Sequence, residues 1–150
     1  MENENGEEIL KKSFSSIREN FRLYLEHQFS PALEWRSRFE TIWVKGANSF
    51  SETGVLVFSE LLWKSFKSPV SGGIRWMIYD TPSYETRIYA YENDVMFYNI
   101  VPAFYGRGMQ AYFNLRYKVS DKLNFFIKCS NRWEGGRTGW FSRFQIIFFW

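Results

Sequence analysis

Apolar and polar side chains alternate with a period of two over most of the chain, which predicts β-strands, since successive strand residues point to opposite faces. The alternation is clearest at the carboxyl end. One face of that strand carries Phe144, Ile146, Phe148 and Trp150. The other face carries Arg143 and Gln145. Strands that are apolar outward and polar inward are typical of transmembrane β-barrels, and the alternative is the buried last strand of a soluble sheet.

Two turns keep this alternation in register. Around Ser30-Pro31-Ala32, apolar residues occupy mainly odd positions both before and after the turn, so a three-residue loop pairs Phe29 with Leu33 on one face. Around Ser120-Asp121-Lys122, the same spacing pairs Val119 with Leu123. The sequence therefore predicts two antiparallel hairpins whose apolar faces coincide.

The pattern predicts seven strands, at about 13–29, 32–44, 54–66, 74–80, 108–119, 122–132 and 139–150. The strands at 54–66 and 74–80 carry apolar residues on both faces, which a plugged or packed lumen tolerates. We expect an all-β fold: an antiparallel up-and-down transmembrane β-barrel of about seven to eight strands, or the C-terminal portion of one. Residues 1–12 are a polar N-terminal segment, and residues 13–150 form one domain. Because single-chain bacterial barrels close with an even number of strands, seven favours part of a larger barrel.

The connections fall into two classes that alternate along the chain. Short, turn-forming connections are expected at 30–32, 67–73 and 120–122, and longer ones at 45–53, 81–107 and 133–138. Outer-membrane barrels alternate short periplasmic turns with long external loops in the same way. We therefore expect 81–107 to be a long extracellular loop, with a hairpin turning at 92–94 that protrudes beyond the membrane.

Composition narrows the classes of function. Aromatic residues make up 21% of the chain although its mean hydropathy is −0.36, as expected where only alternate residues face lipid. The longest apolar run, 146–150, is far shorter than the roughly 20 residues of a membrane helix. A net charge of +3 gives no electrostatic case for a nucleic-acid partner. One cysteine and one histidine predict neither a disulfide nor a transition-metal site, and no cofactor is expected.

Two groups of residues are candidates for function. The 81–107 loop concentrates possible contact residues: Tyr84, Glu85, Arg87, Tyr89, Tyr91, Glu92 and Asp94. The polar strand face carries charges expected to line a lumen: Glu34, Arg36, Arg38, Glu40, Glu60, Arg75, Arg116, Lys118, Lys128 and Arg143. Residues 106–111 spell a G-x-G-x-x-A dinucleotide motif, but a strand pattern follows where the motif needs a helix. The alternatives are a loop packed by its own tyrosines and ion pairs, and a polar interior whose charges neutralise one another.

Two resemblances extend this prediction. The last strand resembles the closing strand of bacterial outer-membrane barrels, which implies that Phe144, Ile146, Phe148 and Trp150 form a signal for the barrel-assembly machinery. Residues 79–128, including "RIYAYEND", "VPAFYGRG", "LRYK" and "SDKL", resemble the C-terminal barrel region of helix-hairpin-helix (ComEA-like) domain-containing outer-membrane proteins of Bacteroidota, as does "SPALEWRSRFE" at 30–40. No helix-hairpin-helix module is found in this sequence, so DNA binding does not carry over, and the "FQIIFFW" ending departs from the family.

The sequence thus predicts a non-enzymatic segment of a bacterial outer-membrane β-barrel, structural or pore-like. The expected partners are outer-membrane lipid, the barrel-assembly machinery, and either missing N-terminal strands or another copy to close the barrel. The acidic start of the chain has no signal peptide, which favours a start further upstream. A soluble lipocalin-like carrier of an apolar ligand is the second hypothesis. An enzyme built on the acidic loop ranks lowest, because no catalytic constellation has a recognisable spacing.

Overall fold

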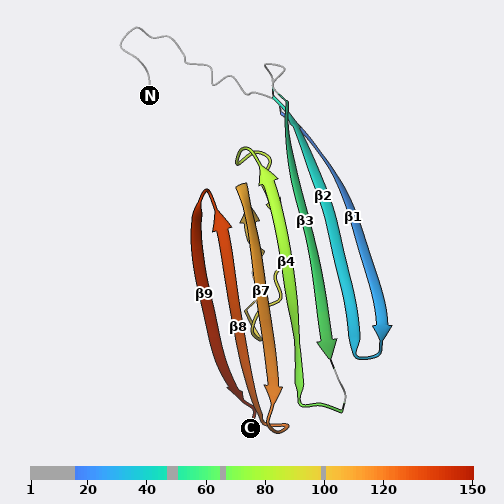
Figure 1. The fold of residues 1–150 in the computed structure, drawn as a ribbon, viewed down its shortest axis with the longest axis vertical. Helices are drawn as coiled ribbons and strands as arrows, with labels where there is room; N and C mark the ends of the chain where they lie inside the picture. Colours follow the sequence, from blue (N-terminus) through green and yellow to red (C-terminus); the bar gives the residue numbers. More distant parts are fainter. Residues whose placement is uncertain (1–15, 47–50, 65–66, 99–100) are drawn as a thin grey trace, which may run out of the picture.

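The computed structural model describes residues 16–46, 51–64, 67–98 and 101–150, so the predicted segment 1–12 lies outside it. The described residues form a seven-stranded antiparallel sheet in the order β1-β2-β3-β4-β7-β8-β9 and a separate pair, β5-β6 (Figure 1). The strands are β1 Ile17–Ser30, β2 Leu33–Lys45, β3 Ser51–Lys64, β4 Val70–Thr81, β5 Ile88–Tyr89, β6 Ala103–Phe104, β7 Gly106–Lys118, β8 Leu123–Glu134 and β9 Arg137–Phe148. Within this part of the chain, no helix is long and apolar enough to cross a membrane.

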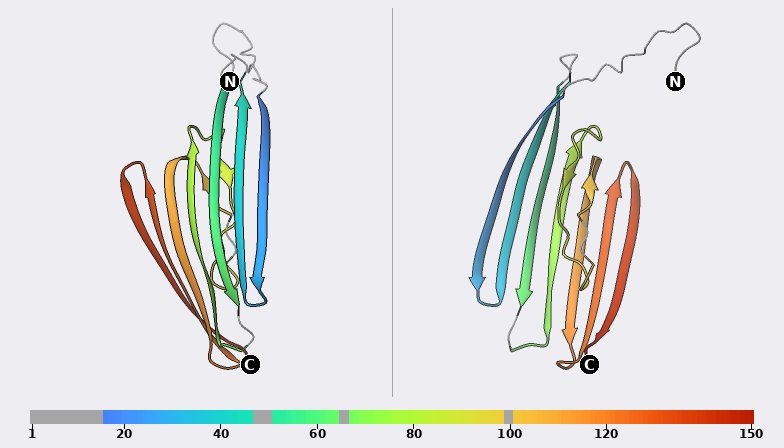
Figure 2. Two further views of the ribbon diagram at one scale, coloured as in Figure 1. Left: turned by 45° about the vertical axis from the view of Figure 1, so that its right-hand side comes forward. Right: turned by 180° about the vertical axis from the view of Figure 1, so that it is seen from behind.

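The predicted all-β antiparallel class is confirmed, and each expected strand matches one strand of the main sheet. The sheet is open, because β1 and β9 lie at its two ends and neither pairs with the other (Figure 2). The described residues of the 81–107 segment add no eighth strand to the main sheet, since β5 and β6 pair only with each other.

One predicted hairpin is confirmed and the other is corrected. Lys118 lies opposite Asn124, and the amide of Val119 donates to the carbonyl of Leu123 (3.0 Å), as a three-residue loop requires. In the first hairpin, Ser30 lies opposite Leu33 after a register shift, so the expected pairing of Phe29 with Leu33 is wrong. The Ser30 hydroxyl accepts a hydrogen bond from the amide of Ala32 (3.2 Å), which favours the tighter turn.

The expectation of a longer connection at 133–138 is also wrong. Strand β8 ends at Glu134 and β9 begins at Arg137, so only Gly135 and Gly136 join them. Both glycines have positive φ, at 56° and 79°, which is the backbone of a type I′ hairpin turn. Two consecutive glycines therefore signalled a tight turn here, and the strict alternation of short and longer connections fails at this position.

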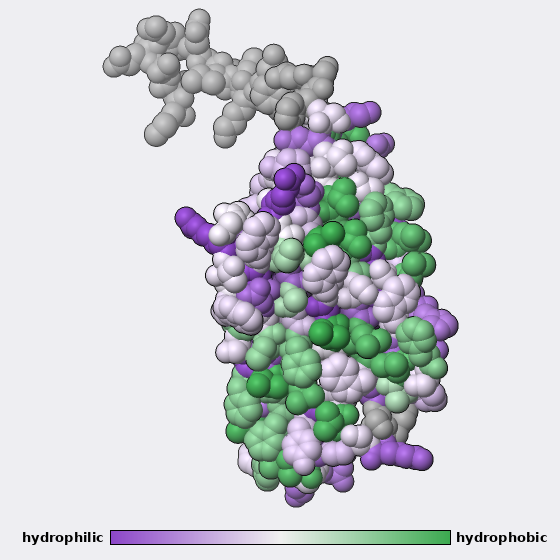
Figure 3. Space-filling model, in the orientation of Figure 1, coloured by the Kyte–Doolittle hydropathy of each residue, from purple (hydrophilic) through white to green (hydrophobic). Residues whose placement is uncertain are grey.

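The sheet has two distinct faces. Residues 86–98 and 101–104, called here the inner segment, lie against one face, which we call the inner face (right-hand view of Figure 2). The opposite, outer face is apolar and aromatic over the front of the strands (Figure 3). The hairpin expected to protrude at 92–94 instead contacts the inner face, because its polar side chains bond to residues of β3 and β8.

The apolar part of the inner face explains the two strands that carry apolar residues on both sides. Strands β2, β3 and β4 contribute the buried side chains Ile42, Val44, Leu56, Phe58, Met77 and Tyr79. The inner segment covers them with Ile88, Ala90 and Phe104, each at most 1% exposed. Burying such side chains contributes about 1.5–3 kcal/mol for each large apolar residue. This cluster fixes the position of the inner segment on the sheet.

Candidate functional site: an ion-pair network on the inner face

Every charge that the sequence predicts for one strand face lies on the inner face of the sheet. The register places them together: Glu34, Arg36, Arg38 and Glu40 on β2, Glu60 on β3, Arg75 on β4, Arg116 and Lys118 on β7, Lys128 on β8 and Arg143 on β9. Lys118 is the outlier, because it pairs with exposed Asp121 at the turn (2.5 Å). Most of the others belong to three clusters that hold the inner segment.

The first cluster is centred on Glu60, whose side chain is 1% exposed. Its carboxylate accepts hydrogen bonds from Arg75 Nη2 (2.9 Å), Tyr112 Oη (2.8 Å) and Asn93 Nδ2 (2.7 Å). Arg75 Nη1 also donates to the carbonyl of Tyr91 (2.5 Å). Since Asn93 and Tyr91 belong to the inner segment, a single buried carboxylate joins three strands of the sheet to that segment.

The second cluster is centred on Lys128, whose side chain is 2% exposed. Its ammonium group lies 2.9 Å from Glu92 Oε2 and 3.1 Å from Asp94 Oδ2. Arg143 Nη1 lies 2.5 Å from the same Asp94 oxygen, and its guanidinium stacks 3.4 Å from the ring centroid of Tyr98. Two inner-face cations therefore neutralise two carboxylates of the inner segment in a buried setting, where the attraction is strong.

The third cluster joins β1 and β2 around Glu40. Arg22 forms a bidentate pair with this carboxylate (2.8 and 3.1 Å), and Asn20 donates to it at 3.0 Å. Arg38 also contacts Glu40 and donates through Nη2 to the carbonyl of Tyr89 (2.9 Å). The inner segment is thus held to the sheet at several points along its length. The carbonyls of Tyr89 and Tyr91 accept hydrogen bonds, and the side chains of Glu92, Asn93 and Asp94 make the remaining contacts.

The loop candidates divide into two groups. Glu92 and Asp94 belong to the buried network, whereas Tyr84, Glu85, Tyr89 and Tyr91 have exposed side chains. Arg87 stacks on Tyr84 at 4.0 Å, and its Nε donates to Tyr89 Oη (2.9 Å), a hydrogen bond that raises the pKa of Arg87. The aromatic and acidic residues of this loop therefore do not converge on one surface.

Gly54 lies where the backbone of the inner segment passes close to the sheet, which leaves no room for a side chain. A Cβ atom at Gly54 on β3 would lie 2.7 Å from the carbonyl oxygen of Thr86, where the inner segment passes over the sheet. A Cβ atom at Gly139 on β9 would have the carbonyl oxygen of Arg132 as its nearest neighbour, at 3.9 Å, which is an ordinary contact. Any larger residue at 54 must therefore displace the inner segment.

We expect Gly54→Ala to destabilise the fold by about 1–3 kcal/mol, the usual cost of overpacking. Gly139→Ala is the matched control, since it adds the same methyl group to a strand without a clash. The readouts are the urea midpoint and protease cleavage within the inner segment. Equal midpoints and equal cleavage for the two variants would contradict the close approach at Gly54.

A cavity of about 440 Å³ remains on the inner face beside the inner segment. Its polar lining includes Arg36, Asn93, Asn114 and Arg116. It lies near the end of the sheet at which the short turns join β1 to β2 and β7 to β8. The inner segment therefore fills only part of the space above the inner face.

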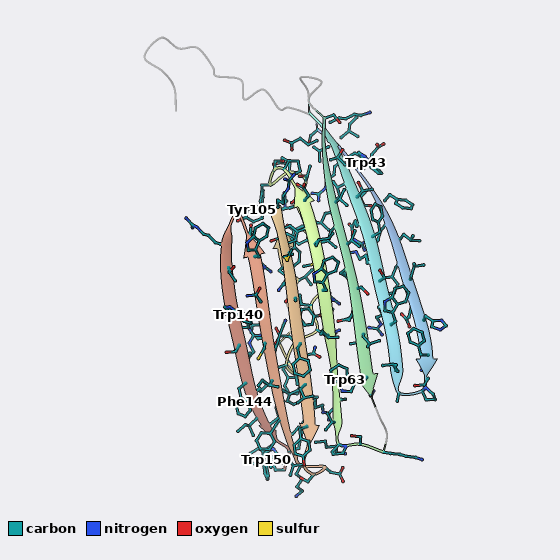
Figure 4. The ribbon with its side chains drawn as sticks, in the orientation of Figure 1. Trp43, Trp63, Tyr105, Trp140, Phe144 and Trp150 are labelled. Carbon is teal, nitrogen blue, oxygen red and sulfur yellow. The ribbon has the colours of Figure 1, made fainter. Side chains whose placement is uncertain are left out.

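Three of the four candidate assembly residues lie on the outer face at the edge of the sheet. Phe144, Ile146 and Phe148 are more than half exposed, and Trp150 follows the end of β9 (Figure 4). The ring of Phe144 stacks on Phe125 of β8, with 6.2 Å between centroids. Phe144, Ile146 and Phe148 thus lie together on one exposed strip of β9.

Several network residues were missed by the sequence analysis. Arg22, and Arg132, whose Nη2 lies 3.7 Å from Glu92 Oε1, follow the same parity as the predicted charges, so parity alone could have found them. Tyr112 and Asn93 carried no such signal, because a tyrosine or asparagine fits either face of a strand or any loop. Their role depends on contacts between residues distant in sequence.

The network holds the inner segment on the sheet through hydrogen bonds and ion pairs. Among the described residues, no group of three or more His, Cys, Asp or Glu side chains could hold a metal ion. No family model, curated protein or solved structure matches the chain. The function is therefore inferred from the chemistry of the two faces.

Proposed function

We propose that this sheet is a non-enzymatic segment of a bacterial outer-membrane β-barrel, with its outer face toward lipid and its inner segment as a plug in the lumen. The observation that best supports this proposal is that charged side chains are buried while aromatic side chains are exposed, the reverse of the arrangement in water-soluble proteins. Lys128, Glu60 and Glu40 have side chains at most 2% exposed, whereas Trp140 and Phe144 are 81% and 63% exposed. Water-soluble proteins seldom expose so wide an apolar surface, while lipid favours it.

The outer face supports this proposal across the whole width of the sheet. Exposed apolar side chains include Leu23, Phe39, Ile74, Trp76, Met109, Phe113, Phe144 and Ile146. Several outward-facing Trp and Tyr residues lie toward the strand ends: Trp35, Trp63 and Tyr117 near the short turns, and Trp43 and Trp133 near the opposite end, whereas Trp76 lies near the middle of β4. Such belts are typical of side chains at the two membrane–water interfaces.

The inner face supports the second half of the proposal. In a barrel of this kind the lumen is polar, and it can be occupied by a segment of the chain. The inner segment meets that description, since its carbonyls accept hydrogen bonds from arginine side chains of the inner face and its carboxylates form ion pairs with a lysine there. A plug held by buried ion pairs implies a structural protein, or a pore that opens only when the plug moves.

The soluble lipocalin-like carrier is the weaker candidate. It requires an apolar face turned toward a ligand cavity, whereas Leu33, Trp35, Phe39, Phe113, Leu115, Phe125 and Ile127 lie on the face opposite the inner segment.

The outer-membrane proposal is tested by fractionation of expressing cells. We expect the protein in alkali-washed outer membranes and a heat-modifiable band on gels. A monodisperse, water-soluble monomer would overturn the proposal.

A further inference from the structure

The two free edges of the sheet, on β1 and β9, are the feature that the proposed function leaves unexplained. Each edge strand presents a row of backbone N–H and C=O groups with no partner in the main sheet. If the sheet lies in a bilayer, as the proposed function requires, every such group left unpaired costs several kcal/mol. Both edges must therefore be covered by other strands.

The direction of the strands limits what can cover them. Neighbouring strands of the main sheet are all antiparallel, so the first and the seventh, β1 and β9, run in the same direction (Figure 1). Joining β1 directly to β9 would create a parallel pair. Transmembrane barrels of bacteria are antiparallel throughout, so an odd number of further strands must separate the two edges.

The same reasoning excludes a second copy as the closing partner. Copies inserted in the same orientation are related by rotation about the membrane normal, which preserves strand direction. The β1 strand of one copy would then meet β9 of the next in parallel, whatever the number of copies. An antiparallel contact between copies would require one of them to be upside down in the membrane.

The inner segment sets a lower limit on the number of added strands. One strand would complete an eight-stranded barrel, whose interior is just wide enough for side chains. The inner segment, however, brings a length of main chain and the pair β5-β6 onto the inner face. A barrel that encloses it needs at least ten strands, so at least three are missing from the sheet.

The chemistry of the edges defines the partner's side chains. On β1, Phe21, Leu23 and Leu25 face outward, while Arg22 faces inward toward Glu40. On β9, Phe144 and Ile146 face outward and Arg143 faces inward. A strand that continues either edge must show the same alternation, with apolar residues toward lipid.

We propose that one β-sheet segment, with an odd number of strands and at least three, bridges β9 to β1 and closes the barrel. Its first and last strands run antiparallel to β9 and β1, and they alternate apolar outward with polar inward. The proposal rests on the proposed membrane function. It adds the number, direction and side-chain pattern of the missing strands.

The first test measures whether β1 and β9 are neighbours. In a Cys129→Ser background, single cysteines at Phe21, Leu23 or Leu25 are combined with cysteines at Phe144, Ile146 or Phe148 and treated with a short bis-maleimide in alkali-washed membranes. The control pair, Ile127→Cys with Phe144→Cys, joins directly opposed residues of β8 and β9. We expect a gel shift for the control and none for any β1–β9 pair. A cross-linked monomer or dimer from any β1–β9 pair would overturn the proposal.

The second test identifies the covering strands. A photoreactive amino acid replaces Leu23 on β1 or Ile146 on β9, and mass spectrometry locates each adduct. We expect both adducts on strands outside residues 17–148, and on two different strands. Protein adducts on β1 or β9, or both protein adducts on one strand, would contradict the inference. If the protein leaves the membrane with the alkaline wash, the proposed function itself fails.

Discussion

Replacing Lys128 with methionine is expected to destabilise the folded protein by about 3–5 kcal/mol, the usual cost of removing one partner of a buried ion pair. The ammonium group is 2% exposed and contacts both Glu92 and Asp94. Methionine fills a similar volume but leaves two carboxylates buried with less compensating charge. The cost is therefore the desolvation of those carboxylates. The remaining ion pairs, of Arg143 with Asp94 and of Arg132 with Glu92, offset only part of it.

The matched control is Lys118→Met. Lys118 lies on the same face, but its side chain is 47% exposed and its partner, Asp121, is at the turn. Exposed pairs of this kind are screened by water and salt, so the urea midpoint should not change measurably. The measurement is urea unfolding in membranes, followed by loss of the heat-modifiable band. Equal midpoints for the two variants would contradict a buried anchor at Lys128.

Replacing Ile74 with arginine is the second large expected effect, and it acts on the outer face. Ile74 is 51% exposed, lies near the middle of β4 and is flanked by Leu61 and Phe113 on neighbouring strands. At the midplane of a bilayer, an arginine facing lipid costs about 2–4 kcal/mol. On the surface of a water-soluble protein, the same change would usually stay within about 0.5 kcal/mol.

Val119→Arg is the control for this prediction, because Val119 is also exposed but lies at the end of the sheet, beside the β7–β8 turn. Near the interface, an arginine costs about 0–1 kcal/mol. We expect folded yield in membranes to fall for Ile74→Arg and to remain near the original for Val119→Arg. Equal yields at both positions would speak against a depth-dependent apolar environment.

The alternation of apolar and polar residues at odd and even positions was enough to predict most of the fold from the sequence. A strand places alternate residues on opposite faces. The odd positions of β7 could therefore be assigned to the outer face, and the even positions of β2 to the inner face, without knowing any contact. This local rule located the strands and placed charges as distant as Glu34 and Arg143 on one face. The faces hold across both turns, since Gln28 lies opposite Glu34 and Lys128 lies opposite Arg143. Only the lengths of the β1–β2 and β8–β9 connections were wrong, because a serine and two consecutive glycines shorten them.

The place of the inner segment was not predictable from local pattern. Residues 92–94 were expected to protrude, because an acidic, tyrosine-rich stretch is typical of an exposed loop. Its carboxylates instead pair with Lys128, more than thirty residues away in sequence. The apolar inner positions of β3, at Leu56 and Phe58, were the available signal, since they require a cover on that face. Combining those two observations would have indicated a loop folded onto the sheet.

The orientation of the outer face toward lipid is tested most directly at Cys129, the single cysteine of the chain. This residue is exposed on the outer face near the middle of β8, opposite Phe113 and Ser142, so a nitroxide label can be attached without any substitution. Collision rates with oxygen and with a water-soluble nickel chelate then report the surroundings of the label in membranes. A lipid-facing label should collide readily with oxygen and rarely with the chelate. Frequent collisions with the chelate would place the outer face in water and contradict the membrane barrel.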